Sequence, residues 1–141
     1  MLRLAVSYNT PKEFREFVER NPLRPGRHSC AARAALERRT IHIPDVSVDP
    51  EYTFGAKAFD NVSTILGVPI LKGNDLLGVM NLHHNMVRPF TDKQIALVET
   101  FADQAAIAIE NVRLLDDCAS APMNSAARSR NFARSAKCLR R

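Results

Sequence analysis

The chain has 141 residues, a net charge of +5, and 45% hydrophobic and 25% charged residues. This length suggests one domain, which can bury about two-thirds of its unfolded surface. No apolar segment approaches the roughly 20 residues of a membrane-spanning helix, and the N-terminal residues MLRLAVSYNT lack the cleavage pattern of a signal peptide. We therefore expect a cytoplasmic protein without a membrane span.

The positive charge is concentrated near the C-terminus. Residues 1–115 hold 14 basic and 13 acidic residues, whereas residues 116–141 hold six basic and two acidic ones. A basic tail can attract nucleic acid or anionic lipid without sequence preference. We therefore expect no specific nucleic-acid recognition, and tail-mediated binding to nucleic acid or a membrane stays an alternative function.

The three cysteines, Cys30, Cys118 and Cys138, are widely spaced and include no CxxC pair. An odd count without local pairs argues against a disulfide framework and against a cysteine zinc site. We expect reduced thiols and no bound metal.

The first forty residues predict a strand followed by two short helices. Apolar and polar residues alternate over Leu2–Asn9, and this period of two is typical of a strand. Thr10 is expected to cap the first helix, with Pro11 at its first position. Ser29 is expected to cap a second helix over Cys30–Arg38.

A short β-branched segment, Thr40–Val46, predicts the next strand, interrupted by Pro44, and a loop of about 15 residues, Ser47–Asn61, follows it. Loops of this length in compact domains are usually functional or mobile. This loop carries three of the nine aromatic residues, Tyr52, Phe54 and Phe59. Their commoner role is to pack over a core, and the alternative is that they close over a bound ligand.

Two apolar segments on either side of a polar turn predict a β-hairpin at Thr64–Lys72 and Leu76–His84. Each segment is apolar on both faces, which places it in a sheet covered on both sides. Gly73 and Asn74 tolerate the positive φ of a tight turn. Pro69 conflicts with a central position, because proline cannot donate a hydrogen bond to a neighbouring strand.

The clearest helix follows Thr91 and extends to Leu115. Thr91 and Gln94 form a capping box, and Asp92 complements the positive helix N-terminus. The apolar residues fall on two adjacent stripes, of which one can pack on the sheet and the other can meet a second helix. The first stripe is Ile95, Val98, Ala102, Ala105, Ile109 and Val112, and the second is Leu97, Phe101, Ala108 and Leu115. Residues 117–141 are predicted to be a flexible basic tail.

The residues of the hairpin and the long helix are more specific than the order of the elements. The segments LGVPIL (66–71), LLGVMNL (76–82), PFTDKQ (89–94) and FADQAAIAIEN (101–111) resemble a GAF domain. The similarity is greatest to bacterial GAF domains placed ahead of histidine-kinase or nucleotide-cyclase modules. It implies an α+β fold with a GAF/PAS-like antiparallel sheet. The long C-terminal helix would pack on one face, and short helices and loops would cover a pocket on the other.

The resemblance also implies that the chain starts late in the domain. A GAF domain normally begins with a long helix and a first strand, so the domain over residues 1–116 would lack both, and residues 117–141 would replace an output domain. The unpaired strand exposes backbone donors and acceptors, and the stripe of the long helix that does not pack on the sheet adds apolar surface. We therefore expect dimerisation or self-association through the C-terminal helix.

Candidate ligand-binding residues lie in the long loop and on the hairpin. Successive strand side chains point to opposite faces, which separates His83 from His84 and argues against a metal site. His83 shares its face with Asn81, and such a polar pair at the end of an apolar face suits a small-molecule pocket. Ser63 can add a hydrogen bond at the head of the hairpin. The expected ligand-binding residues are Tyr52, Phe54, Phe59, Ser63, Asn81 and His83.

No catalytic residues are expected, because the sequence contains no GxSxG, P-loop, HExxH or EF-hand motif. Among the specialised GAF chemistries, the cyclic-nucleotide signature is absent and Cys30 lies in the wrong place for bilin attachment. His42, His83 and His84 are only nominal haem ligands. A small GAF-related redox enzyme is an alternative, but it would have Cys30 alone inside the domain.

The sequence therefore predicts a non-enzymatic sensory or regulatory module of bacterial signal transduction, which binds a small molecule or dimerises. It names neither the ligand nor a cofactor.

Overall fold

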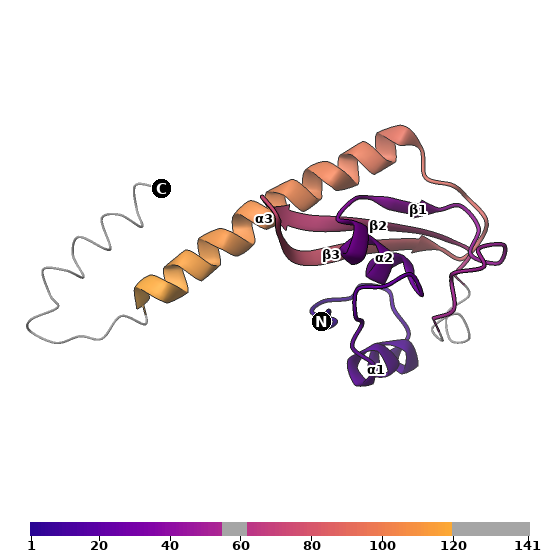
Figure 1. The fold of residues 1–141 in the computed structure, drawn as a ribbon, viewed down its shortest axis with the longest axis horizontal. Helices are drawn as coiled ribbons and strands as arrows, with labels where there is room; N and C mark the ends of the chain where they lie inside the picture. Colours follow the sequence, from indigo (N-terminus) through magenta and orange to yellow (C-terminus); the bar gives the residue numbers. More distant parts are fainter. Residues whose placement is uncertain (55–61, 120–141) are drawn as a thin grey trace, which may run out of the picture.

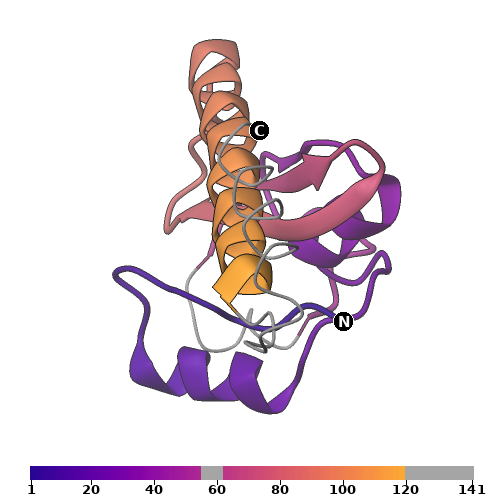
Figure 2. The ribbon, with the colours of Figure 1, turned by 90° about the vertical axis from the view of Figure 1, so that its left-hand side faces the viewer.

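The computed structural model describes residues 1–54 and 62–119. The elements are α1 (Lys12–Arg20), α2 (Cys30–Glu37), β1 (Ile41–Ile43), β2 (Thr64–Lys72), β3 (Asp75–His84) and α3 (Asp92–Ala119). The strands form one antiparallel sheet in the order β1-β2-β3. Figures 1 and 2 show α3 along one face of the sheet and α2 on the other. This arrangement confirms the predicted α+β class with a long C-terminal helix on one face.

The hairpin of β2 and β3 forms as the sequence predicts. The two strands pair along their length, with one register shift between Ile70 and Leu71. Gly73 occupies the turn with a φ of +57°, a left-handed conformation that glycine adopts without steric cost.

Pro69 fits into the central strand because β2 is only partly flanked. Pro69 pairs with Val79 of β3, whereas β1 pairs only with Ile65, Leu66 and Gly67. Beyond Gly67, β3 is therefore the one strand beside β2 within the described residues. A proline in that stretch removes no hydrogen bond from the ladder if its nitrogen faces the open side.

The predicted capping box at the start of α3 is present. The backbone N–H of Gln94 donates to Thr91 Oγ1 at 3.2 Å, and the backbone N–H of Thr91 donates to Gln94 Oε1 at 2.9 Å. Val98, Ala102 and Ala106 are the buried residues of the helix. Val98 and Ala102 pack on the face of the sheet that presents Leu66, Val68, Met80 and Leu82.

The C-terminal half of α3 extends beyond the sheet (Figure 1). Ile109 and Val112 of the first stripe are exposed, as are Phe101 and Leu115 of the second stripe. The helix also continues to Ala119. The prediction of a tail from residue 117 is therefore wrong for residues 117–119, and the rest of that segment lies outside the described residues.

A close approach between α2 and β2 defines the second face of the sheet. A Cβ atom placed on Gly67 would lie 3.0 Å from Cys30 Sγ and 3.2 Å from the Cys30 carbonyl oxygen. Ser29 caps α2 as predicted, because its Oγ accepts a hydrogen bond from the Ala32 N–H at 3.1 Å. The core on this side consists of Cys30, Ala34, Ile41, Ile43, Val46, Tyr52 and Ile65.

Several predicted boundaries change. The helix α2 ends at Glu37, with Arg38 as its C-terminal cap in a left-handed conformation. The strand predicted over Thr40–Val46 is shortened to Ile41–Ile43, which ends immediately before Pro44. Proline cannot continue a hydrogen-bonded ladder, and this explains the early end.

The strand predicted at Leu2–Asn9 does not form. Its one pairing within the described residues is an isolated bridge between Leu2 and Leu23, and Val6 and Tyr8 are exposed. An alternating pattern becomes a strand only when a neighbouring strand satisfies its backbone N–H and C=O groups. The described part of the chain places no strand beside this segment.

The cap predicted for α1 is also wrong. Pro11 is the N-cap of this helix and forms no side-chain cap hydrogen bond. The Thr10 hydroxyl instead donates to the Tyr8 carbonyl oxygen at 3.2 Å.

Candidate functional site

A cavity of about 500 Å³ lies between the segment that precedes α1 and the end of β3. This volume falls within the range of about 300–1,000 Å³ that is typical of small-molecule sites. We call this cavity the β3-end pocket, and its lining residues are Asn9, Pro11, His83, His84, Asn85, Met86 and Arg88. These seven residues include a guanidinium, two imidazoles and two amides, and no carboxylate.

Hydrogen bonds from Ser63 and from Thr64, the first residue of β2, hold one wall of the pocket. The buried Thr64 hydroxyl donates to the Pro44 carbonyl oxygen at 2.6 Å and accepts the Arg88 N–H at 2.9 Å. The Ser63 hydroxyl donates to the Asn85 carbonyl oxygen at 3.2 Å. The segment between β3 and α3 is therefore fixed against the head of the hairpin.

Aromatic contacts connect the pocket to the start of α3. The ring of His84 stacks on Phe90, with ring centroids 4.5 Å apart. The Phe90 N–H donates to His42 Nε2 at 3.1 Å. Burial lowers the pKa of His42, and the neutral imidazole is the form that can accept this hydrogen bond. His42 thus positions Phe90.

Three of the expected ligand-binding residues lie at or near the β3-end pocket. His83 lines it. Ser63 contributes through its hydrogen bond to Asn85. Asn81 is exposed two residues before His83 on the same strand face, but it is not among the lining residues.

The two described aromatic residues of the long loop, Tyr52 and Phe54, lie elsewhere. Tyr52 is 7% exposed and belongs to the core between α2 and the sheet. Phe54 packs edge-on against Phe17 of α1, with ring centroids 5.5 Å apart. Phe59 lies outside the described residues. The rings of Tyr52 and Phe54 therefore make packing contacts away from the pocket.

Sequence reasoning missed most of the lining. It assigned His84 to a solvated strand end and gave no role to the residues that follow it. The available signal was the polar segment His83–Arg88 between an apolar strand and a capped helix. The contribution of Asn9 had no such signal, because it depends on how the N-terminal segment folds back.

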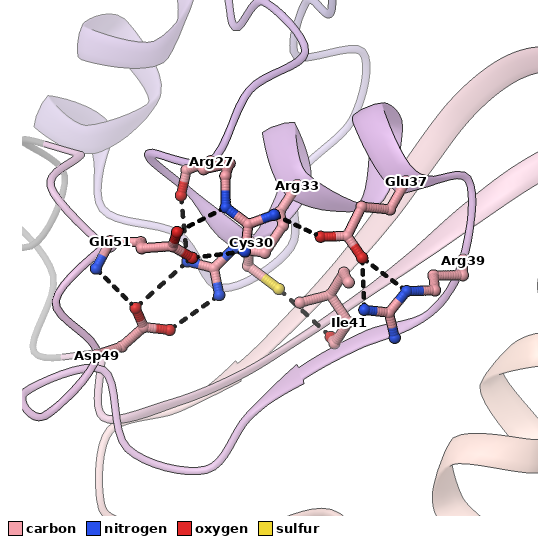
Figure 3. A network of polar contacts seen from close by, with 8 residues as sticks. All are labelled: Arg27, Cys30, Arg33, Glu37, Arg39, Ile41, Asp49 and Glu51. Carbon is pink, nitrogen blue, oxygen red and sulfur yellow. Dashed lines mark hydrogen bonds and ion pairs between the residues drawn. The ribbon is translucent and has the colours of Figure 1, made fainter.

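A second cluster of charged residues lies over α2 (Figure 3). Arg33 donates from Nη1 to Asp49 Oδ2 at 2.9 Å, and its side chain is 9% exposed. Arg27 donates to Glu51 from Nε at 2.6 Å and to Glu37 from Nη1 at 3.0 Å. We call this cluster the arginine network, and its members are Arg27, Arg33, Arg39, Glu37, Asp49 and Glu51.

The arginine network fixes the segment after β1 onto α2. The hydrogen bond from Arg33 holds the pKa of Asp49 below its usual range, and the same bond raises the pKa of Arg33. Each arginine of the network faces at least one carboxylate. The three positive and three negative charges of the network are therefore paired with one another within the chain.

Cys30 is poorly suited to redox chemistry. Its buried thiol donates to the Ile41 carbonyl oxygen at 3.4 Å, and burial raises its pKa to about 12. The thiolate is the reactive form of cysteine, and this environment opposes its formation at neutral pH. Cys118 is disulfide-bonded, which contradicts the expectation of a reduced thiol at that position.

Two negative observations apply to residues 1–54 and 62–119. No group of three or more histidine, cysteine, aspartate or glutamate side chains in these segments is placed to hold a metal ion. None of their helices combines the length and hydrophobicity that a membrane crossing requires.

Comparison with known proteins identifies relatives of this fold. The family model for the GAF domain matches residues 3–109. No curated protein matches the chain. Among solved structures, a GAF domain/HD domain protein from Geobacter sulfurreducens is similar with a TM-score of 0.64 and 20% identity, over 79% of this chain and 75% of that one.

Two further structures are similar. The GAF-B domain of DevS from Mycobacterium smegmatis has a TM-score of 0.58 and 20% identity, over 79% of this chain and 71% of that one. The GAF domain of a phosphoenolpyruvate-protein phosphotransferase from Coxiella burnetii has a TM-score of 0.56 and 21% identity, over 61% of this chain. The chain spans 52% of the Coxiella domain and 60% of a GAF domain region of a putative membrane protein from Geobacter sulfurreducens.

Proposed function

Since the chain belongs to the GAF family, we propose that it is a sensory or regulatory module of bacterial signal transduction that binds a small molecule. The observation that carries the proposal is the β3-end pocket, whose volume of about 500 Å³ is in the range of small-molecule sites and whose lining offers several hydrogen-bonding groups. A cytoplasmic location is part of the proposal.

The position of the pocket supports a regulatory mechanism. Asn85, Met86 and Arg88 belong both to the pocket and to the connection between β3 and α3. His84 stacks on Phe90, immediately before the capping box of α3. A ligand that contacts this connection would favour one arrangement of α3 over another, which is the population shift that couples a site to an output.

Self-association through α3 is the second part of the proposal. Phe101 and Leu115 are 56% and 63% exposed, and they are two heptads apart on the same helix. Exposed apolar residues at this spacing suit a helical interface with a second copy. We expect light scattering to give a dimer for the natural chain at tens of micromolar and a monomer for Phe101→Glu. A monomeric natural chain would contradict this part.

Mass spectrometry of the purified full chain tests ligand binding. Spectra recorded under native conditions should show a retained small molecule, and His83→Ala should lose it. Asn81→Ala is the matched control, because Asn81 is on the same strand face but does not line the pocket. Equal retention in the two variants, or no retained molecule together with no stabilisation by any compound of a metabolite library, would overturn the proposal.

A further inference from the structure

We propose that the ligand of the β3-end pocket is a small oxyanion, either a phosphate ester or a carboxylate, which is recognised by Arg88. This inference rests on the proposed function, because it names the ligand class of the same pocket.

The first argument is the state of the Arg88 charge. Arg27, Arg33 and Arg39 each form an ion pair with a carboxylate of the arginine network. Arg88 forms no ion pair with any residue in the described segments. A guanidinium presents paired donors that match the two oxygens of a carboxylate or phosphate. The pocket therefore offers a cation whose counterion the described chain does not supply.

The second argument is the chemistry of the remaining wall. The imidazoles of His83 and His84 and the amides of Asn9 and Asn85 can all donate hydrogen bonds to oxygen. None of the seven described lining residues is acidic. A bound anion would therefore meet donors without like-charge repulsion from these residues, whereas a cationic ligand would face the Arg88 charge directly.

The third argument is the fixed backbone of the pocket wall that carries Asn85 and Arg88. The backbone of Arg88 is held by the buried Thr64 hydroxyl at 2.9 Å, and the backbone of Asn85 is held by Ser63 at 3.2 Å. A pocket wall whose backbone is already held in place loses less entropy when a ligand binds.

The test uses three ligands with the same three-carbon skeleton: glycerol 3-phosphate, glycerate and glycerol. Each is titrated into the full chain by calorimetry, and the contact residues are followed by amide chemical shifts. We expect saturable binding of at least one of the two anions, shifts at His83, Asn85 and Met86, and no binding of glycerol. The phosphate and carboxylate arms decide which oxyanion the pocket takes.

Two arginine variants separate the pocket from general electrostatics. Arg88→Gln should weaken the binding of the anion about tenfold or more, since hydrogen bonds to charged groups contribute substantially to affinity. Arg113→Gln removes the same charge from an exposed position on α3 and should leave affinity unchanged. Equal weakening by both variants would overturn the inference.

The outcomes also separate this inference from the proposed function. If neither anion binds, or if glycerol binds as tightly as both, the oxyanion inference fails. If a neutral molecule is nevertheless retained by the natural chain and lost in His83→Ala, the proposed sensory function stands without it. If no ligand of any class binds, both fail.

Discussion

The arginine network over α2 and the β3-end pocket each contain a guanidinium group, but only the one in the network is paired with carboxylates of the described residues. In the network, Arg33 is surrounded by carboxylates and is almost fully buried. In the pocket, Arg88 lies at the surface and pairs with no carboxylate of the described residues. A neutralised, buried guanidinium holds a segment of the chain in place, whereas one without a counterion is available to a ligand. The two regions should therefore respond differently to the loss of their arginine.

The largest expected effect is on stability, from Arg33→Met. The variant leaves Asp49, whose side chain is 16% exposed, without its main partner. Loss of one member of a buried ion pair typically costs about 3–5 kcal/mol, and we expect a value near the lower end because Asp49 keeps some contact with water. Chemical denaturation would measure it. Arg39→Met, at an exposed position, is the control, and equal losses in the two variants would contradict a structural role for Arg33.

The next effect concerns the packing beneath the network. Gly67→Ala places a methyl group 3.0 Å from Cys30 Sγ, so α2 must move away from β2, and overpacking of this kind typically costs about 1–3 kcal/mol. Gly78→Ala is the matched control on β3, because its nearest neighbour would be Ile70 Cδ1 at 3.7 Å, an ordinary contact. Chemical denaturation would compare the free energies of unfolding of the two variants. If Gly67→Ala were as stable as the natural chain, α2 would not be packed tightly against β2.

A smaller effect is the pH dependence that the network produces. The pKa of Asp49 is lower in the folded chain than in the unfolded chain, chiefly through its hydrogen bond with Arg33. The resulting stabilisation is therefore complete above the unfolded pKa of about 3.9 and is lost as the pH falls through the lower folded value. Thermal unfolding of the natural chain and of Asp49→Asn, measured between neutral and acidic pH, should show a steeper acid loss for the natural chain. If the two proteins lost stability equally as the pH fell, the stabilising role of the Asp49 carboxylate would be contradicted.

The smallest effect on stability is expected from Arg88→Gln. Only the backbone of Arg88 takes part in a hydrogen bond within the described residues, and surface substitutions of this kind usually change stability by less than about 0.5 kcal/mol. Chemical denaturation alongside Arg33→Met tests this directly. A loss comparable to that of Arg33→Met would make Arg88 a structural residue and remove the contrast.

Much of the fold could be predicted because its signals are local. The capping box of Thr91 and Gln94, and the turn at Gly73 between two apolar segments, are patterns within a few residues. The strand predicted at Leu2–Asn9 failed for the opposite reason. Its alternation was genuine, but a strand also needs a neighbour, and the described chain supplies none.

The candidate site was less predictable because its parts are distant in sequence. His83 could be chosen from strand alternation and the polar residues around it. Arg88 and Asn9 could not, since their positions depend on contacts that no periodic pattern records. The hydrogen bond from Arg88 to Thr64 joins residues 24 positions apart, and it determines where this wall of the pocket lies.

The most direct test of the central claim is thermal unfolding of the natural chain and of Arg88→Gln, each with and without the anion, glycerol 3-phosphate or glycerate, that binds in the calorimetric titration. A ligand that binds only the folded state stabilises it by about 2.7 kcal/mol at a hundred times its Kd. We predict that the two proteins have the same Tm without ligand and that only the natural chain gains stability with it. A lower Tm for Arg88→Gln without ligand, or an equal gain in both proteins, would contradict the assignment of Arg88 to ligand binding.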